Sequence, residues 1–167
     1  MERTDVISFL SKDFWKYINQ GGMHPGELSA AQISGMPSSH TNINSTEKEY
    51  IETMSKAERA RYLAITILIA IKDCSDFEYR GKHKSILDAY YVQNLDNRST
   101  AIKVNMSDAQ YKRAKKEALQ EFIQRYNFWR DYRQCPELPE IYYPQKPKKL
   151  PKSTQKATKI NPKTSHY

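Results

Sequence analysis

The sequence of 167 residues predicts an all-α protein that ends in a basic tail. Gly is rare, with five residues, and Lys, Glu, Gln and Ala are common, which favours helices over sheets. Apolar residues recur at helical spacing in several segments. Hydrophobic residues make up only 38% of the chain, so the sequence can bury one modest helical core and leaves little apolar material for a second.

The first half of the chain predicts two helices joined by a long loop. Residues 5–19 carry apolar side chains at helical spacing, and residues 23–44 are rich in Ser, Gly, Pro and Asn. The second helix is expected to begin at Thr46, whose side chain can form a capping box with Glu49. Its segment 63–71 is apolar on all sides, which predicts either the centre of the domain or the seam of a homodimer.

The second half of the chain predicts three helices, at residues 82–93, 99–104 and 107–132. The chain is expected to break at Ser75-Asp76, before the first of them. The tight turn before the last helix contains Asn105, which tolerates the left-handed backbone region. Ser107 and Gln110 can then form a capping box, and Pro residues after residue 135 end the helix.

Positive charge is concentrated in two segments, although the net charge is only +8. Residues 141–167 contain seven lysines and no acidic residue, so residues 1–140 hold 20 basic and 19 acidic groups. We expect the tail after Pro139 to be disordered, because its few apolar side chains cannot offset the entropy of ordering. The segment 103–133 carries eight basic and four acidic residues, as a phosphate-binding surface would need.

Residues 86–126 follow the plan of a helix-turn-helix: helix, polar turn, short helix, tight turn and long basic helix. In that motif the last helix enters the major groove of DNA. One side of this helix forms an apolar stripe, and Arg113 and Lys116 lie opposite. Lys112 and Lys115 flank the stripe, with stems long enough to reach phosphates. The predicted DNA-binding residues are Ser107, Ala109, Gln110, Lys112, Arg113, Lys115 and Lys116.

The same segment contains a characteristic series of residues: Ile86-Leu87, Tyr90-Tyr91, Ala101-Ile102, Asn105-Met106-Ser107, Tyr111, Lys115-Lys116-Glu117-Ala118-Leu119 and Phe122. This series resembles region four of bacterial sigma factors and, more closely, the ArpU and RinA families of phage transcriptional regulators. The resemblance covers 41 of the 167 residues, and it departs from the family pattern at Thr100 and in the polar segment 96–98. It implies a sequence-specific regulator that activates phage late genes with RNA polymerase.

The expected organisation has three parts: an N-terminal helical and oligomerisation region at residues 1–80, the helix-turn-helix at 81–135, and the basic tail at 136–167. Duplex DNA and a second copy of the chain are the expected partners, because helix-turn-helix proteins commonly bind paired half-sites as dimers. Two alternatives stay open. One is a helical adaptor whose basic helix docks on an acidic protein surface, and the other is a small terminase-like packaging protein that forms rings on DNA.

No pattern in the sequence predicts a catalytic, metal or cofactor site. Cys74 and Cys135 are far apart and have no Cys-x-x-Cys spacing, and the four histidines are scattered without ligand spacing. The longest apolar run, residues 63–71, is shorter than the roughly 20 residues of a membrane-spanning helix, and the N-terminus lacks the layout of a signal peptide. We therefore expect a non-enzymatic protein in the cytoplasm of a bacterial host.

Deletion of the residues after Tyr143 tests whether the basic tail contributes to DNA binding. The fold and the base preference are expected to stay unchanged, because the recognition segment precedes the tail. The non-specific affinity is expected to fall and the dependence of log K on log salt to flatten, because lysines attract DNA over a distance that salt shortens. Anisotropy titrations at several salt concentrations measure both quantities. Equal slopes for the two proteins would identify the tail as a solubilising extension.

Overall fold

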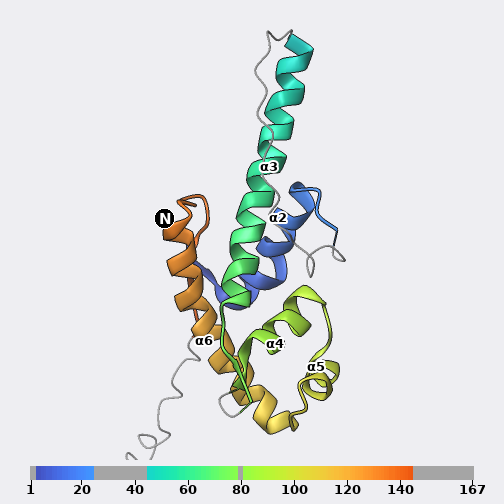
Figure 1. Cartoon of the computed structure of the whole chain (residues 1–167), viewed down its shortest axis with the longest axis vertical. Helices are drawn as coiled ribbons and strands as arrows, with labels where there is room; N and C mark the ends of the chain where they lie inside the picture. The colour runs from blue at the N-terminus through green and yellow to red at the C-terminus, as the bar shows by residue number, and fades with distance from the viewer. Residues whose placement is uncertain (1–2, 25–44, 79–80, 145–167) are drawn as a thin grey trace, which may run out of the picture.

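The computed structural model describes residues 3–24, 45–78 and 81–144, with side chains from residue 55 onward in the second of these ranges. Helices dominate, as the sequence predicts, and two small two-stranded sheets accompany them. The all-α prediction is wrong about these sheets, because strands of two or three residues are too short to show an alternating pattern. A long central helix runs between two others, and a group of shorter helices lies at one end (Figure 1).

The predicted N-terminal helix is confirmed as one helical run with a π-helical turn inside it. It comprises α1 (Val6–Ser8), the π-helical segment η1 (Phe9–Asp13) and α2 (Phe14–Gln20), and it follows strand β1 (Arg3–Asp5). The Asp5 carboxylate starts the run by accepting hydrogen bonds from the backbone N–H groups of Ile7 and Ser8. The buried side chains of this run are Val6, Phe9, Leu10, Phe14 and Ile18.

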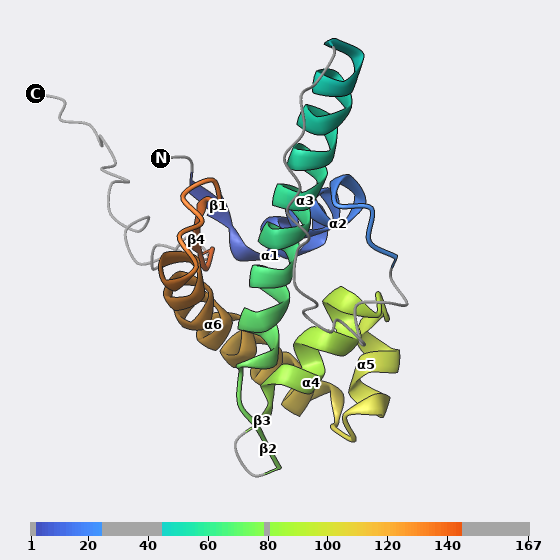
Figure 2. The same cartoon turned by 45° about the horizontal axis from the view of Figure 1, so that its top comes forward.

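The long predicted helix is α3 (Ser45–Lys72). Its C-terminal half packs between α2 and α6, and its buried residues there are Leu63, Ala64, Thr66, Ile67, Leu68, Ala70 and Ile71. The predicted central position is therefore borne out for these seven residues, whereas Ile65 and Ile69 on the remaining side are half-buried and the homodimer seam stays a prediction. The N-terminal half extends beyond the other described elements (Figures 1 and 2). The predicted loop from residue 25 onward, and the side chains of the predicted capping box at Thr46, lie outside the described residues.

A small hairpin connects α3 to the second half of the chain. Strands β2 (Asp76–Phe77) and β3 (Gly81–Lys82) pair in antiparallel fashion where the sequence predicts only a break. The predicted helix at 82–93 is confirmed as α4 (His83–Leu87), which continues into the π-helical segment η3 (Asp88–Val92).

The last two predicted helices are confirmed as α5 (Asn97–Lys103) and α6 (Asp108–Tyr132). α5 begins two residues earlier than expected, because the Asp96 carboxylate accepts a hydrogen bond from the backbone N–H of Ser99 at 2.9 Å and caps the helix.

The chain after α6 turns back on the body and contributes to the core. Strand β4 (Glu140–Tyr142) lies parallel to β1, and Ile141 is buried. The Tyr126 hydroxyl donates a hydrogen bond to the backbone carbonyl of Pro139 at 2.8 Å. The prediction that the chain is disordered after Pro139 is therefore wrong for residues 140–144, because the buried Ile141 and a partner strand at the other end of the described chain hold them. Residues 145–167 lie outside the described part.

Two hydrophobic clusters organise the described residues. The larger one contains residues of the N-terminal helical run from α1 to α2, of α3, of η3, of the C-terminal half of α6, and of the segment up to Ile141. The smaller one lies between α4, α5 and the start of α6, and it consists of Ile86, Ala101, Val104, Tyr111 and Ala114. Because the larger cluster contains residues from both sides of position 80, the predicted regions 1–80 and 81–135 share a core.

The substitution Gly81→Ala tests how closely the hairpin packs on α4. Its φ is 95°, and a Cβ built there would lie 2.7 Å from Nε2 of His83. Gly81→Ala is expected to lower the free energy of unfolding by about 2–3 kcal/mol, because backbone strain adds to the overlap. Gly22→Ala is the control, since its φ is 62° but a Cβ there meets no atom within 4 Å. Its expected loss is about 1 kcal/mol. Urea unfolding followed by circular dichroism compares the two, and equal losses would contradict the role of the His83 contact.

Candidate nucleic-acid interface

The elements of the predicted helix-turn-helix, α4, α5 and the start of α6, surround the smaller hydrophobic cluster at the end of the molecule opposite the projecting half of α3 (Figure 1). The tight turn between α5 and α6 forms as predicted, with Asn105 at a φ of 56° and the backbone N–H of Met106 bonded to the Ala101 carbonyl at 3.0 Å. The predicted capping box also forms. The Ser107 hydroxyl accepts from the backbone N–H of Gln110, while the Gln110 side chain accepts from the N–H of Ser107. The start of α6 is thus fixed by its own residues.

Six of the seven predicted DNA-binding residues are exposed on the first turns of α6: Ser107, Ala109, Gln110, Lys112, Arg113 and Lys116. Within this group the Ser107 and Gln110 side chains bond to each other, which commits them to the helix cap. Arg113 lies opposite the buried stripe, and the small Ala109 lies on the same outward face. The outward surface at the start of α6 is therefore formed by Ala109, Arg113 and Lys116.

Lys115 has a different environment from the other predicted residues. A residue four positions after Tyr111 lies only about 40° from it around a helix, so Lys115 falls within the apolar stripe instead of flanking it. Its ammonium lies 3.0 Å from the centroid of the Tyr90 ring and donates to Oδ1 of Asn97 at 2.9 Å. Burial lowers the pKa of Lys115 to about 8. This lysine therefore joins η3, α5 and α6, and its ammonium is already engaged by Tyr90 and Asn97.

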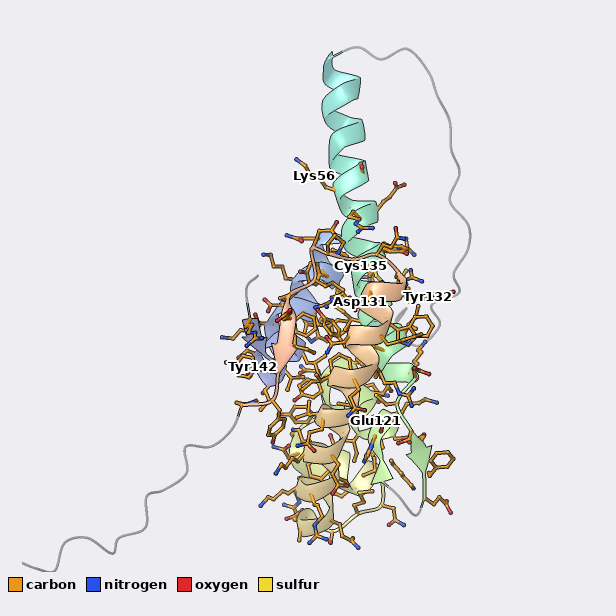
Figure 3. All side chains as sticks on the ribbon, turned by 90° about the vertical axis from the view of Figure 1, so that its left-hand side faces the viewer. Lys56, Glu121, Asp131, Tyr132, Cys135 and Tyr142 are labelled. Atoms are coloured by element: carbon orange, nitrogen blue, oxygen red, sulfur yellow. The ribbon has the colours of Figure 1, made fainter. Side chains whose placement is uncertain are left out.

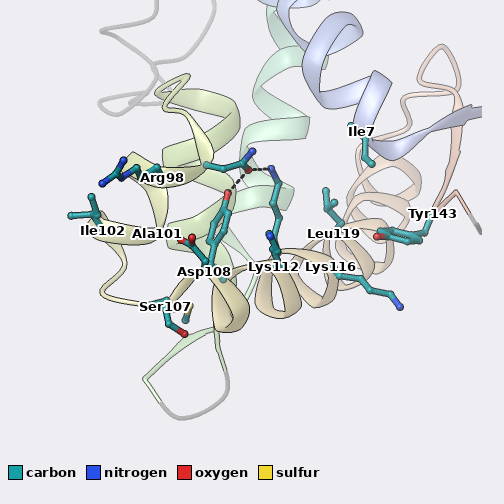
Figure 4. Close-up of a pocket in the computed structure, with 14 residues that line it drawn as sticks. Ile7, Arg98, Ala101, Ile102, Ser107, Asp108, Lys112, Lys116, Leu119 and Tyr143 are labelled. Atoms are coloured by element: carbon teal, nitrogen blue, oxygen red, sulfur yellow. Dashed lines mark hydrogen bonds between the residues drawn. The ribbon is translucent and has the colours of Figure 1, made fainter.

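A groove of about 720 Å³ lies between α5, α6 and the segment after β4 (Figure 4). Lys112 and Lys116 of α6 line it together with Arg98, while Tyr143 lies at the end farthest from Arg98. The sequence assigned Arg98 to a polar turn and did not identify it as a site residue. The signal that could have found it is the Asp96-x-x-Ser99 spacing, which places Arg98 in the first turn of α5.

The side of α6 that faces away from this groove carries Glu117 and Glu121, and it takes part in a polar cluster. The Glu121 carboxylate accepts hydrogen bonds from the hydroxyl and the backbone N–H of Ser75, at 2.7 and 2.9 Å. Nδ1 of the buried His83 lies 2.5 Å from Oε2 of Glu121, and its Nε2 lies 3.9 Å from Glu117. Burial alone would raise the pKa of Glu121, but the hydrogen bonds from His83 and Ser75 outweigh it and lower that pKa. The cluster therefore links the end of α3, the start of α4 and the middle of α6.

This polar cluster does not have the geometry of a nucleophilic relay. In such a relay the hydroxyl and the carboxylate contact opposite ring nitrogens of the histidine. Here Ser75 and Glu121 both contact Nδ1 of His83. Both cysteines are buried, and burial raises the pKa of Cys74 to about 12, which keeps its thiol protonated. Within residues 3–24, 45–78 and 81–144, no three His, Cys, Asp or Glu side chains are grouped to hold a metal ion.

No protein-family model, curated protein sequence or solved structure matches the chain. The family resemblance therefore depends on the residues of the segment 86–126 themselves. Among the described residues, no helix combines the length and the apolar character that crossing a membrane requires.

Lys115→Met tests the buried position of this lysine through the pH dependence of stability. The pKa of about 8 in the folded protein lies below the ordinary 10.5, so the unfolded chain binds more protons between these values. The free energy of unfolding of the wild type should therefore rise relative to Lys115→Met, by about 1–2 kcal/mol between pH 8 and pH 10. Urea titrations at both pH values measure the difference. Lys112→Met, an exposed change on the same helix, controls for the loss of charge, and the same trend in both variants would contradict the assignment.

Proposed function

We propose that the chain is a sequence-specific regulator that binds duplex DNA through α4, α5 and α6. The observation that carries the proposal is the start of α6: a capped helix whose apolar stripe is buried in a separate small cluster, while Arg113 and Lys116 project outward. A recognition helix needs this combination, because it must be rigid on its inner face and free to enter the major groove on its outer face.

The positions of the basic residues suggest distinct roles on DNA. Arg113 lies opposite the buried stripe, where a guanidinium can form two hydrogen bonds with guanine. Lys112 and Lys116 on α6 and Arg98 on α5 line one groove, and we assign them to backbone phosphates on that side of the recognition helix. Ala109 is small and exposed, so the helix backbone can approach the base edges closely.

The resemblance to ArpU and RinA regulators supports a finer proposal: activation of phage late genes together with RNA polymerase in the bacterial cytoplasm. The adaptor alternative would place the same basic residues on an acidic protein, and the packaging alternative would arrange several copies in a ring. Affinity that falls steeply with salt on duplex DNA favours the regulator over the adaptor. A molecular mass in solution below that of a ring of several copies favours the regulator over the packaging protein.

Sequencing of bound fragments tests the proposal directly. Fragments of host and phage DNA are incubated with the protein at about 0.15 M salt and selected by pull-down over several rounds. Enrichment of one motif, with a salt-dependent affinity that exceeds the non-specific affinity by at least about a thousandfold, is the expected result. Recovery of all fragments in proportion to their input would overturn sequence-specific recognition.

Arg113→Ala and Lys116→Ala test the roles of the two outward cations. Arg113→Ala is expected to weaken binding and to relax the preference at one base pair by about 1–3 kcal/mol. Lys116→Ala should weaken all sequences alike and reduce the salt slope by about 1, because a phosphate contact is lost. Anisotropy titrations against the selected site and a scrambled site separate the two effects. Lys16→Ala, an exposed change on α2, is the matched control, and a folded double variant with unchanged affinity would refute the assignment.

A further inference from the structure

One face of α3 is turned away from the centre of the core although it carries apolar side chains, and only the edge of the larger cluster touches Ile65. Ile65 and Ile69 are half-buried there, and the exposed charged residues Glu58 and Lys72 lie on the same face. Seven residues of a helix return to within about 20° of the same direction, so Glu58, Ile65 and Lys72 form a straight row. In the described residues neither Glu58 nor Lys72 takes part in an ion pair.

An exposed aromatic cluster lies beside this face of α3. The Phe128 and Tyr132 rings of α6 stack with their centroids 5.8 Å apart, and their residues are 58% and 71% exposed. Trp129 donates to Asp73, and Arg133 donates to Thr66, so this part of α6 runs antiparallel beside the C-terminal half of α3. Tyr132 points away from the body of the molecule (Figure 3). Exposed apolar groups in one contiguous patch are typical of a docking surface.

We propose that a second copy of this chain docks on the outward face of α3, with the two α3 helices antiparallel around a two-fold axis at Ile65. Glu58 and Lys72 lie seven residues before and after Ile65, so the axis brings Glu58 of one copy opposite Lys72 of the other. Symmetry forms this ion pair twice. A parallel arrangement would instead place like charges together, at a cost in free energy. The charge pattern of the face therefore fits a second copy in the antiparallel orientation.

The same arrangement would place protein next to two further exposed features of the chain, the projecting half of α3 and Phe77 of the hairpin. The N-terminal half of α3 projects beyond the other described elements (Figures 1 and 2), and Phe77 of the hairpin beyond the other end of α3 is 65% exposed. In an antiparallel pair the projecting half of one α3 passes Lys72 of the other copy and continues toward its hairpin. Long helices gain most of their stability from packing on a neighbour, and the second copy provides that neighbour.

The proposed interface leaves the candidate DNA surface uncovered. Arg113 and Lys116 lie near the start of α6, at the end of the molecule opposite the projecting half of α3 (Figure 1). An antiparallel pair holds two such surfaces at its opposite ends. Because dimerisation is measured without DNA, its outcome is independent of the proposed DNA binding.

Charge exchange on α3 tests both the interface and its direction. Sedimentation equilibrium at about 1–50 μM protein gives the dimer dissociation constant. E58K and K72E alone each place like charges opposite one another twice, and each is expected to raise that constant about tenfold. The double variant E58K/K72E restores opposite charges and is expected to return the constant to near its wild-type value. Lys56→Glu is the matched control, because Lys56 lies nine residues before Ile65, on the opposite face of α3 (Figure 3).

Three results would overturn the proposal. A monomeric wild type over this concentration range would assign the face to a different protein. A dimer that neither single variant weakens would place the interface elsewhere. A double variant that stays as weak as the single ones would exclude the antiparallel pairing. The substitutions Phe128→Ala and Tyr132→Ala provide a second measurement at exposed positions that do not disturb the core, and each is expected to raise the dissociation constant several-fold.

Discussion

α6 buries one apolar stripe in two hydrophobic clusters at once, and the rest of the structure is arranged around this packing. Tyr111 and Ala114 near its start complete the small cluster with α4 and α5. Phe122 and Tyr126 further along pack in the large cluster with the N-terminal helices and α3. Because an α-helix is stiff over 25 residues, the large core sets the direction in which the exposed start of α6 points. Loss of the stripe would separate the two clusters and release the candidate interface from the body.

Polar contacts fix how α6 is rotated about its own axis, which the apolar packing alone does not determine. The Ser75, His83 and Glu121 cluster joins three elements on the acidic side of α6, and Lys115 joins three on the other side through Tyr90 and Asn97. Apolar surfaces can slide over one another at little cost, whereas a buried polar group without its partner is costly. These two sets of polar contacts therefore fix the orientation of α6 about its own axis. In that orientation Arg113 and Lys116 face outward.

The faces of α6 divide the proposed functions between them. The N-terminal half presents Arg113 and Lys116, while the Glu117 and Glu121 side faces the hairpin and the end of α3. The C-terminal half carries the exposed rings of Phe128 and Tyr132 beside α3. The proposed second copy on α3 and the proposed DNA at the start of α6 would thus occupy separate surfaces of the molecule. In the proposed dimer, both candidate DNA surfaces would therefore stay uncovered.

The helices, the capping box of α6 and the Asn105 turn followed from the sequence alone, because each depends on residues within about four positions of one another. The tertiary structure decided the rest. The pairing of β1 with β4 joins residues at opposite ends of the described chain, and the contact of His83 with Glu121 spans 38 positions. The environment of the Lys115 ammonium depends on Tyr90 and Asn97. These residues lie on η3 and α5, so the helical pattern of α6 could not predict the contact. Local sequence specifies which segments are helical, whereas the neighbours that a side chain meets depend on how distant segments pack.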